Sequence, residues 1–199
     1  MKLLRNICRI LIGLTFIYSG FVKGVDPLGS NYKFIDYFNA FGMPWMNFSA
    51  LFFSFLLFLA EFMIGIGLLL NIKTKWASWG ALLFMGVFTP LTLILAIKNP
   101  VTDCGCFGDA LVLTNWETFW KNIILLALTL VVFYNRTKFK SIFNVLEESL
   151  LLAITALFML GIECYSYRHL PLLDFRPYAI GKNITEGMTI PEGAPHDQY

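Results

Sequence analysis

The sequence predicts an all-α integral membrane helical bundle. Three observations support this class: a high content of hydrophobic residues, a low content of charged residues and five long apolar stretches. Of the 199 residues, 57% are hydrophobic and 14% are charged, against roughly 45–50% and about 25% in an average soluble domain. Five stretches are apolar over about the 20 residues that a helix needs to cross a bilayer. We therefore expect a four-helix core plus a fifth transmembrane helix over residues 1–165, followed by an irregular extracytoplasmic tail over 166–199.

The five expected spans cover about 4–22, 48–70, 76–97, 116–134 and 145–165. The first resembles a secretory signal, but Ile17-Tyr18-Ser19 lacks the small residues of a cleavage site, so we expect it to remain as a helix. The fourth is the least apolar because Glu117 and Lys121 lie near its start. These two charges have the i,i+4 spacing that allows a helical ion pair.

Positive charges near the helix ends predict a cytoplasmic N-terminus. With that orientation, eight of the 15 Lys and Arg residues fall in one short terminus and two short inner loops. All five Trp residues fall at span ends, where an amphipathic ring is anchored between headgroups and hydrocarbon. The loop 98–115 and the tail then face the outside. The eight inner cations are Lys2, Arg5, Arg9, Lys73, Lys75, Arg136, Lys138 and Lys140.

The loop between the first two spans contains a periodic aromatic segment. Phe34, Phe38 and Phe41 recur at helical spacing after Ser30 and Asn31, which are residue types that cap helix N-termini. Two interpretations stay open: a short helix lying in the membrane plane over the bundle, or an ordered loop with aromatic anchors.

Several function classes are excluded by the composition. The formal net charge is only +2, so the chain has no basic surplus for neutralising nucleic-acid phosphates. It contains no phosphate-binding glycine loop, no Ser-His-Asp arrangement and no His-rich metal motif. We expect membrane lipid as its surroundings and no nucleic-acid partner.

The sharpest motif is Cys104-Gly105-Cys106, in the loop between the third and fourth spans. Gly105 gives the backbone the freedom to bring both thiols into one small disulfide ring. Exposed or strained disulfides have the more oxidising potentials of catalytic pairs, and extracytoplasmic compartments allow disulfides to persist. This pattern favours a redox centre with Cys104 and Cys106 as its catalytic residues.

Other interpretations of this cysteine pair remain open. It could be a purely structural disulfide, or two thiols without a role. A zinc site would need further ligands, for which only Cys164, His169 and His196 are expected on the same side. Cys164 could also act as a resolving or relay thiol, or as a small apolar residue.

Glu61 lies more than half-way along the second span. An ionisable group at that depth should face the bundle interior and be protonated or paired. It could serve beside a bound quinone or in a proton path, or it could be a neutral acid hydrogen-bonded to a neighbouring helix. Lys23 and Asp26, at the end of the first span, are its candidate partners.

Four features together resemble the MauE/DoxX family of redox-associated membrane proteins. They are Tyr18-Ser19-Gly20-Phe21-Val22-Lys23, Ala60-Glu61, Cys104-Gly105-Cys106-Phe107-Gly108 and the small multi-helix size, over about residues 5–135. The resemblance implies a four-helix bundle in the bacterial inner membrane and a role in disulfide formation in periplasmic proteins. The tail, with Arg176-Pro177-Tyr178, is similar to linkers that lead to a thioredoxin-like domain in longer relatives.

The resemblance and the motif together suggest a thiol-disulfide oxidoreductase that passes electrons from a periplasmic thioredoxin-like or other dithiol partner to the membrane. The analogy with quinone-coupled disulfide generators makes a quinone the candidate acceptor. Glu61, Lys23 and Cys164 are candidate accessory residues, and no metal is expected. Two other classes stay open: a non-enzymatic scaffold or assembly factor that tolerates loss of the cysteines, and a small transporter that depends on Glu61.

Overall fold

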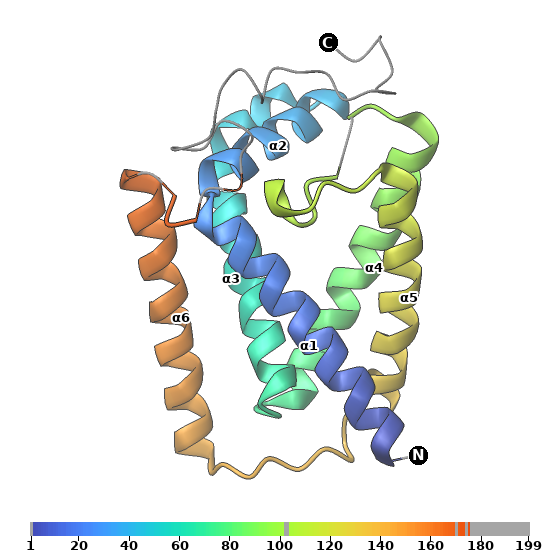
Figure 1. The fold of residues 1–199 in the computed structure, drawn as a ribbon, viewed down its shortest axis with the longest axis vertical. Coiled ribbons are helices and arrows are strands. Elements are labelled where there is room, and N and C mark those ends of the chain that lie inside the picture. The colour runs from blue at the N-terminus through green and yellow to red at the C-terminus, as the bar shows by residue number, and fades with distance from the viewer. Residues whose placement is uncertain (1, 102–103, 170, 174, 176–199) are drawn as a thin grey trace.

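The structure is a computed structural model that describes residues 2–101, 104–169, 171–173 and 175, apart from the side chain of residue 109. Within these residues it contains helices and connecting loops but no strand (Figure 1). The elements in chain order are α1 (Lys2–Val25), α2 (Pro27–Ala40), η1 (Pro44–Ser49), α3 (Ala50–Leu69), α4 (Thr74–Lys98), η2 (Gly108–Ala110), α5 (Asn115–Tyr134) and α6 (Val145–Arg168).

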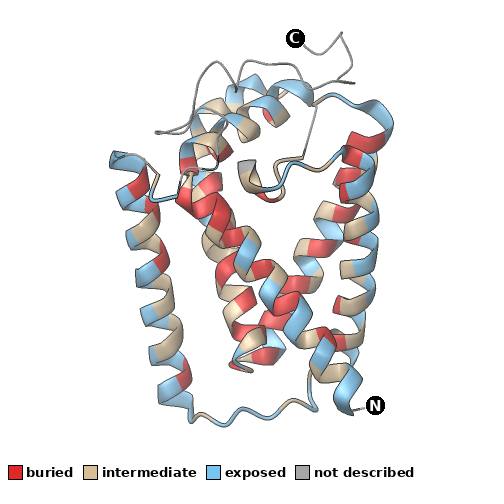
Figure 2. Cartoon of the chain, viewed as in Figure 1, coloured by how far each residue is buried: buried red, intermediate tan, exposed pale blue. Residues whose placement is uncertain are grey.

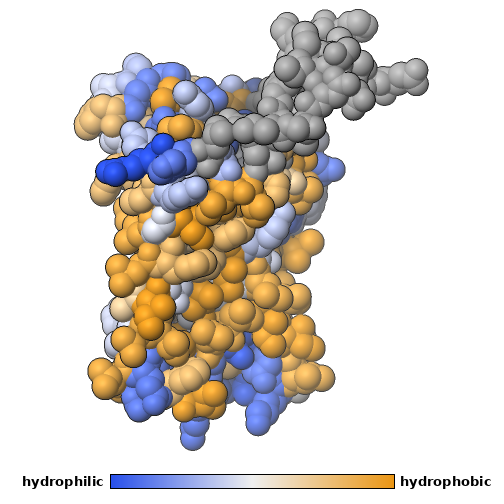
Figure 3. Space-filling model, turned by 60° about the vertical axis from the view of Figure 1, so that its left-hand side comes forward, coloured by the Kyte–Doolittle hydropathy of each residue, from blue (hydrophilic) through white to orange (hydrophobic). Residues whose placement is uncertain are grey.

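Five of these elements are long and apolar enough to span a membrane: α1, the η1–α3 unit, α4, α5 and α6. Each overlaps one of the spans expected from the sequence, so the prediction of an all-α membrane bundle is confirmed. On the face shown in Figure 3, hydrophobic side chains cover the middle of the molecule, with hydrophilic residues towards both ends. A chain with this surface is a multi-pass membrane protein.

The helices are arranged as two tight pairs and one outer helix. α1 crosses α3, α4 lies beside α5, and α6 packs against α3 and α1 from the outside (Figure 1). Glycines allow α1 and α3 to approach closely: a Cβ added at Gly20 would lie 2.8 Å from the backbone nitrogen of Phe62. Small residues at such crossings are the usual means of close packing between membrane helices.

Buried residues concentrate where the two pairs meet (Figure 2). Near the end of the bundle that carries the N-terminus, α1, α3, α4 and α5 fill the space between them with apolar side chains. The buried members of this cluster are Cys8, Ile12, Phe16, Leu68, Ala77, Ala81, Met85 and Val132. This end is therefore solidly packed.

The opposite end is covered by α2, which lies across the bundle (Figure 1). The in-plane helix is thus the interpretation that the structure supports. Its start differs from the prediction, because Asp26, not Ser30 or Asn31, caps it by accepting a hydrogen bond from the Gly29 N–H at 3.0 Å. Pro27 occupies the first helical position, where its fixed φ and missing N–H favour helix initiation. Asp26 is consequently a cap and not a partner of Glu61.

α6 continues to Arg168, slightly beyond the expected end of the fifth span at 165. Most of the tail expected at 166–199, including Arg176-Pro177-Tyr178, lies outside the described residues. The N-terminus, the α3–α4 turn and the α5–α6 loop share one end of the bundle (Figure 1). The eight cations assigned to the inner face therefore lie together, opposite the loop that carries the cysteines.

Candidate functional site

The loop between α4 and α5 folds back over the end of the bundle and carries the two cysteines. Its turns use positive φ at three places: Asn99 (45°), Gly105 (59°) and Gly108 (53°). The flexibility expected of Gly105 is therefore used. The Asn115 side-chain amide ties the base of the loop together by donating to Asn99 Oδ1 and Val101 O, both at 2.8 Å.

Three side chains of the bundle hold the tip of this loop. The Tyr37 hydroxyl of α2 donates to the carbonyl of Cys104 at 2.6 Å, and the Ser19 hydroxyl of α1 lies 2.9 Å from the carbonyl of Cys106. Phe107 is buried and packs against Tyr18, with ring centroids 5.5 Å apart. The cysteines are thus fixed to α1 and α2 and not carried by a free loop.

Cys104 and Cys106 are joined by a disulfide in the structure, and both residues are partly exposed. Cys104 Sγ accepts a hydrogen bond from the backbone N–H of Cys106 at 3.1 Å. The hydroxyl of Thr118, a fully buried residue of α5, lies 3.5 Å from the same sulfur and can donate to it. The two sulfurs are therefore not equivalent, since two donors surround Cys104 Sγ.

Beneath the loop, Glu61 and Lys23 form a buried ion pair. Lys23 Nζ donates to Glu61 Oε1 at 2.6 Å, and the two side chains are 6% and 2% exposed, respectively. The structure thus places the two accessory residues expected from the sequence in direct contact. Their pairing offsets part of the cost of holding either charge within the membrane.

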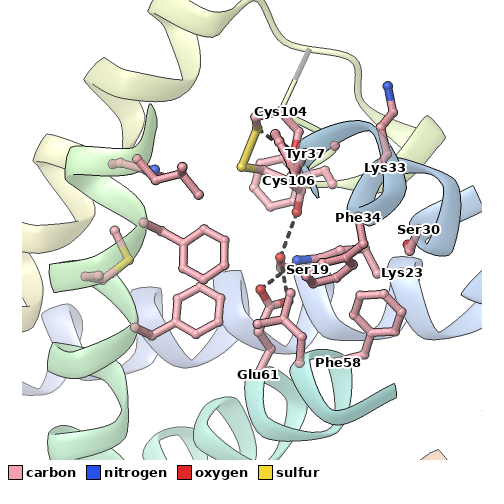
Figure 4. A pocket seen from close by; sticks show the side chains of 18 of the residues that line it. Ser19, Lys23, Ser30, Lys33, Phe34, Tyr37, Phe58, Glu61, Cys104 and Cys106 are labelled. Carbon is pink, nitrogen blue, oxygen red and sulfur yellow. Dashed lines mark hydrogen bonds and ion pairs between the residues drawn. A yellow bond between two sulfur atoms is a disulfide. The ribbon is translucent and has the colours of Figure 1, made fainter. Parts of the chain in front are cut away.

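Ser19 links this ion pair to the cysteine loop (Figure 4). Its hydroxyl lies 2.9 Å from both Glu61 Oε2 and the carbonyl of Cys106. A hydroxyl has one proton to donate, so Ser19 serves one acceptor at a time. Glu61 and the loop carbonyl therefore compete for that proton, and Ser19 connects the ion pair to the cysteine loop.

A cavity of about 260 Å³ lies between these groups and the helices. The disulfide is at one end, the Lys23–Glu61 pair lies on one wall, and phenylalanines provide much of the remainder (Figure 4). Phe84 and Phe88 of α4 also line the cavity and form a stacked pair with centroids 4.3 Å apart. All of the described lining comes from α1 to α5 and their loops, and none from α6.

Lys121 also lines the cavity, and this corrects the sequence-based expectation. It does not pair with Glu117, because the Glu117 carboxylate accepts from the Thr114 N–H and hydroxyl at 2.9 and 2.8 Å, as part of a capping box. The Lys121 ammonium lies 4.1 Å from the centroid of the Phe107 ring. Among the described residues it forms no ion pair. The lining of the cavity therefore includes three lysines, Lys23, Lys33 and Lys121, and one carboxylate, Glu61.

Sequence reasoning missed Ser19, Tyr37, Thr118 and Lys121 as site residues. A signal existed for most of them: Ser19 is four residues before Lys23, and Thr118 and Lys121 are three apart, so each pair shares a helix face. Thr114 with Glu117 also matches the capping-box pattern, which would have removed Glu117 as a partner of Lys121.

The remaining candidates lie elsewhere. Cys164 is an exposed free thiol on α6 and does not line the cavity, whereas Cys8 is buried in the core at the other end. His169 stacks on Tyr165 at the end of α6, and His196 lies outside the described residues. Within the described part of the chain, no three His, Cys, Asp or Glu side chains are gathered for a metal ion.

A comparison with known protein families shows to which family the chain belongs. The sequence model described as "Methylamine utilisation protein MauE" matches residues 1–135. The chain belongs to the MauE family. The matched region ends at the C-cap of α5, Asn135, so it includes the whole described lining of the cavity, while α6 lies beyond the MauE match. No curated protein and no solved structure matches the chain.

Proposed function

We propose that this MauE-family protein is a thiol-disulfide redox protein that exchanges electrons between an extracytoplasmic dithiol and an acceptor within the membrane, through Cys104 and Cys106. The observation that carries the proposal is the position of the disulfide. It is partly exposed at the end of the bundle and also lines a largely apolar cavity that reaches between the membrane helices.

The exchange balances in two steps. A partner thiolate attacks one sulfur of the Cys104–Cys106 disulfide, which forms a mixed disulfide and releases the other sulfur as a thiolate. The partner's second thiol displaces the mixed disulfide, so the partner leaves oxidised and both cysteines are reduced. Two electrons and two protons have then entered the site, and the membrane acceptor must remove them to restore the disulfide.

The partner and the orientation are parts of this proposal. A thioredoxin-like or other dithiol protein on the periplasmic side of a bacterial inner membrane would meet the cysteine loop. The N-terminus would be cytoplasmic, which the grouping of eight cations at the opposite end of the bundle supports. Lys23 and Glu61 would act as accessory groups, since the Ser19 hydroxyl connects Glu61 to the cysteine loop.

The test uses the purified full chain in detergent, reduced with dithiothreitol and then reoxidised, with the thiols counted as a mass shift after maleimide labelling. We expect labelling of Cys104 and Cys106 to appear on reduction and to disappear on reoxidation. With a soluble quinone added as electron acceptor, Cys104→Ser and Cys106→Ser should each abolish turnover of a dithiol substrate, and Cys164→Ser, at the exposed thiol of α6, is the matched control. If both single variants keep full turnover, the cysteines only fix the loop and the scaffold alternative replaces the redox function.

A further inference from the structure

We infer that the cavity beneath the disulfide is a binding site for the head group of a monocyclic quinone, which serves as the electron-accepting substrate. The inference rests on the proposed function, because it names the acceptor of that same site. It is carried by the size of the cavity, by its aromatic walls and by the charged groups that line it.

Size limits the class of ligand. An apolar cavity of about 150 Å³ accepts benzene, and this one is about 260 Å³. A substituted single ring therefore fits, whereas sites for drug-sized ligands usually enclose about 300–1,000 Å³. Flavins and haems, which are larger fused or macrocyclic ring systems, are too big for the described space.

The walls offer a flat ring a place to stack. Phe84 and Phe88 lie nearly parallel, with an interplanar angle of 13°, and both line the cavity. Phe58 lies on the wall that carries the ion pair, where Lys23 Nζ is 5.7 Å from its centroid. Offset stacking of aromatic rings adds about 0.5–1.5 kcal/mol to area burial. A lipid acyl chain would gain nothing specific from this arrangement.

The polar groups match a quinone better than a hydrocarbon. A quinone has two carbonyl acceptors at opposite ends of the ring, and the cavity presents the ammonium groups of Lys23 and Lys121 from different helices. The amide of Asn122 is also in the lining, with one N–H used at 3.2 Å by Thr92. Lys33 also lines the cavity, so three ammonium groups outnumber the one carboxylate, Glu61, and this favours a ligand whose oxygens become more negative on reduction.

The redox step balances with this substrate. Reduced Cys104 and Cys106 form their S–S bond and lose two electrons and two protons. The quinone takes up both and its two carbonyls become the two hydroxyls of a hydroquinone. No further oxidant or reductant is needed.

The test is photolabelling of the full chain in detergent with an azido-substituted ubiquinone analogue, followed by peptide mapping. We expect labelled residues in α4 between Phe84 and Leu91 or in α5 between Lys121 and Leu125, and loss of this label in excess decyl-ubiquinone. Two variants should lower labelling about tenfold: Leu91→Trp, which fills the cavity, and Lys121→Met, which removes a charged donor. The matched controls are Leu83→Trp on the exposed face of α4 and Lys98→Met at its exposed end.

Each outcome bears on a defined part of the account. The quinone site is wrong if the label is confined to lipid-facing residues. It is also wrong if neither excess decyl-ubiquinone nor the two cavity variants lower the labelling. The same preparation is assayed for exchange between dithiothreitol and the disulfide. If exchange occurs without labelling of the cavity, the quinone site is wrong while the proposed redox function stands with another acceptor. If the cavity is labelled but the cysteines do not exchange, the cavity binds a quinone, but the redox function and the quinone's role as electron acceptor fail.

Discussion

The buried pair of Lys23 and Glu61 is the residue-scale feature with the largest expected effect on stability. Each group is nearly inaccessible to solvent, and they are 2.6 Å apart. Breaking such a pair leaves one uncompensated charge, which typically costs about 3–5 kcal/mol, whereas replacing both partners with uncharged residues of similar size is often nearly neutral.

Glu61→Gln should therefore lower the thermal midpoint of the detergent-solubilised protein clearly, because the Lys23 ammonium loses its carboxylate. The double variant Lys23→Met/Glu61→Gln should recover most of that loss, and Asp36→Asn at an exposed position of α2 is the control for charge removal. Thermal unfolding followed by circular dichroism measures all three. A double variant less stable than the single one would contradict the pairing as the stabilising interaction.

The sulfurs of Cys104 and Cys106 should differ in reactivity. Two donors face Cys104 Sγ, the Cys106 N–H and the Thr118 hydroxyl, so the Cys104 thiolate should be the better leaving group. A partner thiolate should then attack Cys106. With a peptide disulfide, whose second sulfur leaves as a thiol, Cys104→Ser should accumulate a mixed disulfide through Cys106, and Cys106→Ser should accumulate much less.

Thr118 provides a direct check of this asymmetry. Thr118→Val should slow alkylation of Cys104 by iodoacetamide near neutral pH, since one donor to the thiolate is lost, while Thr118→Ser should retain the rate. The loss of one hydrogen bond to a charged sulfur corresponds to about tenfold or more in the thiolate population. Equal alkylation rates in both variants would show that Thr118 does not influence the sulfur.

Much of the site at this scale was visible in the sequence. The Cys104-Gly105-Cys106 motif is recognisable because its residues are adjacent in the sequence. Glu61 is recognisable because a carboxylate inside an apolar span is energetically costly. The inward position of Lys121 was not predicted, because the i,i+4 rule gave Glu117 as its partner and did not consider the competing capping box. Ser19 and Tyr37 were missed since their roles depend on long-range contacts with a loop 67 to 87 residues away.

At the scale of the helices, the crossing of α1 and α3 determines where Ser19 and Lys23 meet Glu61. Gly20 and Gly65 are at this crossing, whereas Gly24 faces Met159 and Glu163 of α6 and Gly67 faces the α3–α4 turn. The small-residue spacing of Gly20 and Gly24 was readable from the sequence. It could not show that each glycine faces a different helix, because that depends on how three helices pack together.

Gly20→Ala should destabilise the protein by about 1–3 kcal/mol, because the new Cβ would meet backbone atoms of α3 within 3.0 Å and the helices must move apart. It should also weaken the Lys23–Glu61 contact and so reduce thiol turnover. Gly86→Ala on α4 is the matched control, since nothing described lies within 4 Å of its Cβ. Equal thermal midpoints for the two variants would mean that the crossing is looser than the structure indicates.

α6 contributes one unexpected feature, a buried carboxyl group. Glu163 is fully buried beside Gly24, and neither of its oxygens has a hydrogen-bond partner among the described residues. A buried polar group without a partner costs about 1–3 kcal/mol. Glu163→Leu should therefore raise the thermal midpoint, with Asp36→Leu at an exposed position of α2 as control. A lower midpoint for Glu163→Leu would show that Glu163 stabilises the protein through another group.

At the scale of the whole molecule, the fold was the most predictable property. Long apolar spans and Trp residues at their ends follow from the bilayer itself, and all five Trp side chains are exposed on the surface of the bundle. The cavity was not predictable, because it arises where the α1–α3 and α4–α5 pairs diverge beneath the cysteine loop. No local pattern encodes such a space.

The Cys104–Cys106 disulfide lies at the end of the bundle opposite the N-terminus, so its accessibility from outside the cell tests the redox function most directly. Intact cells producing the protein are treated with a membrane-impermeant maleimide, with and without mild prior reduction, and labelling is read as a mass shift. Cys164→Ser removes the exposed thiol of α6 from the measurement. We predict that Cys104 and Cys106 are labelled only after reduction. Labelling without reduction, or no labelling under either condition, would contradict an accessible redox disulfide on the outer face.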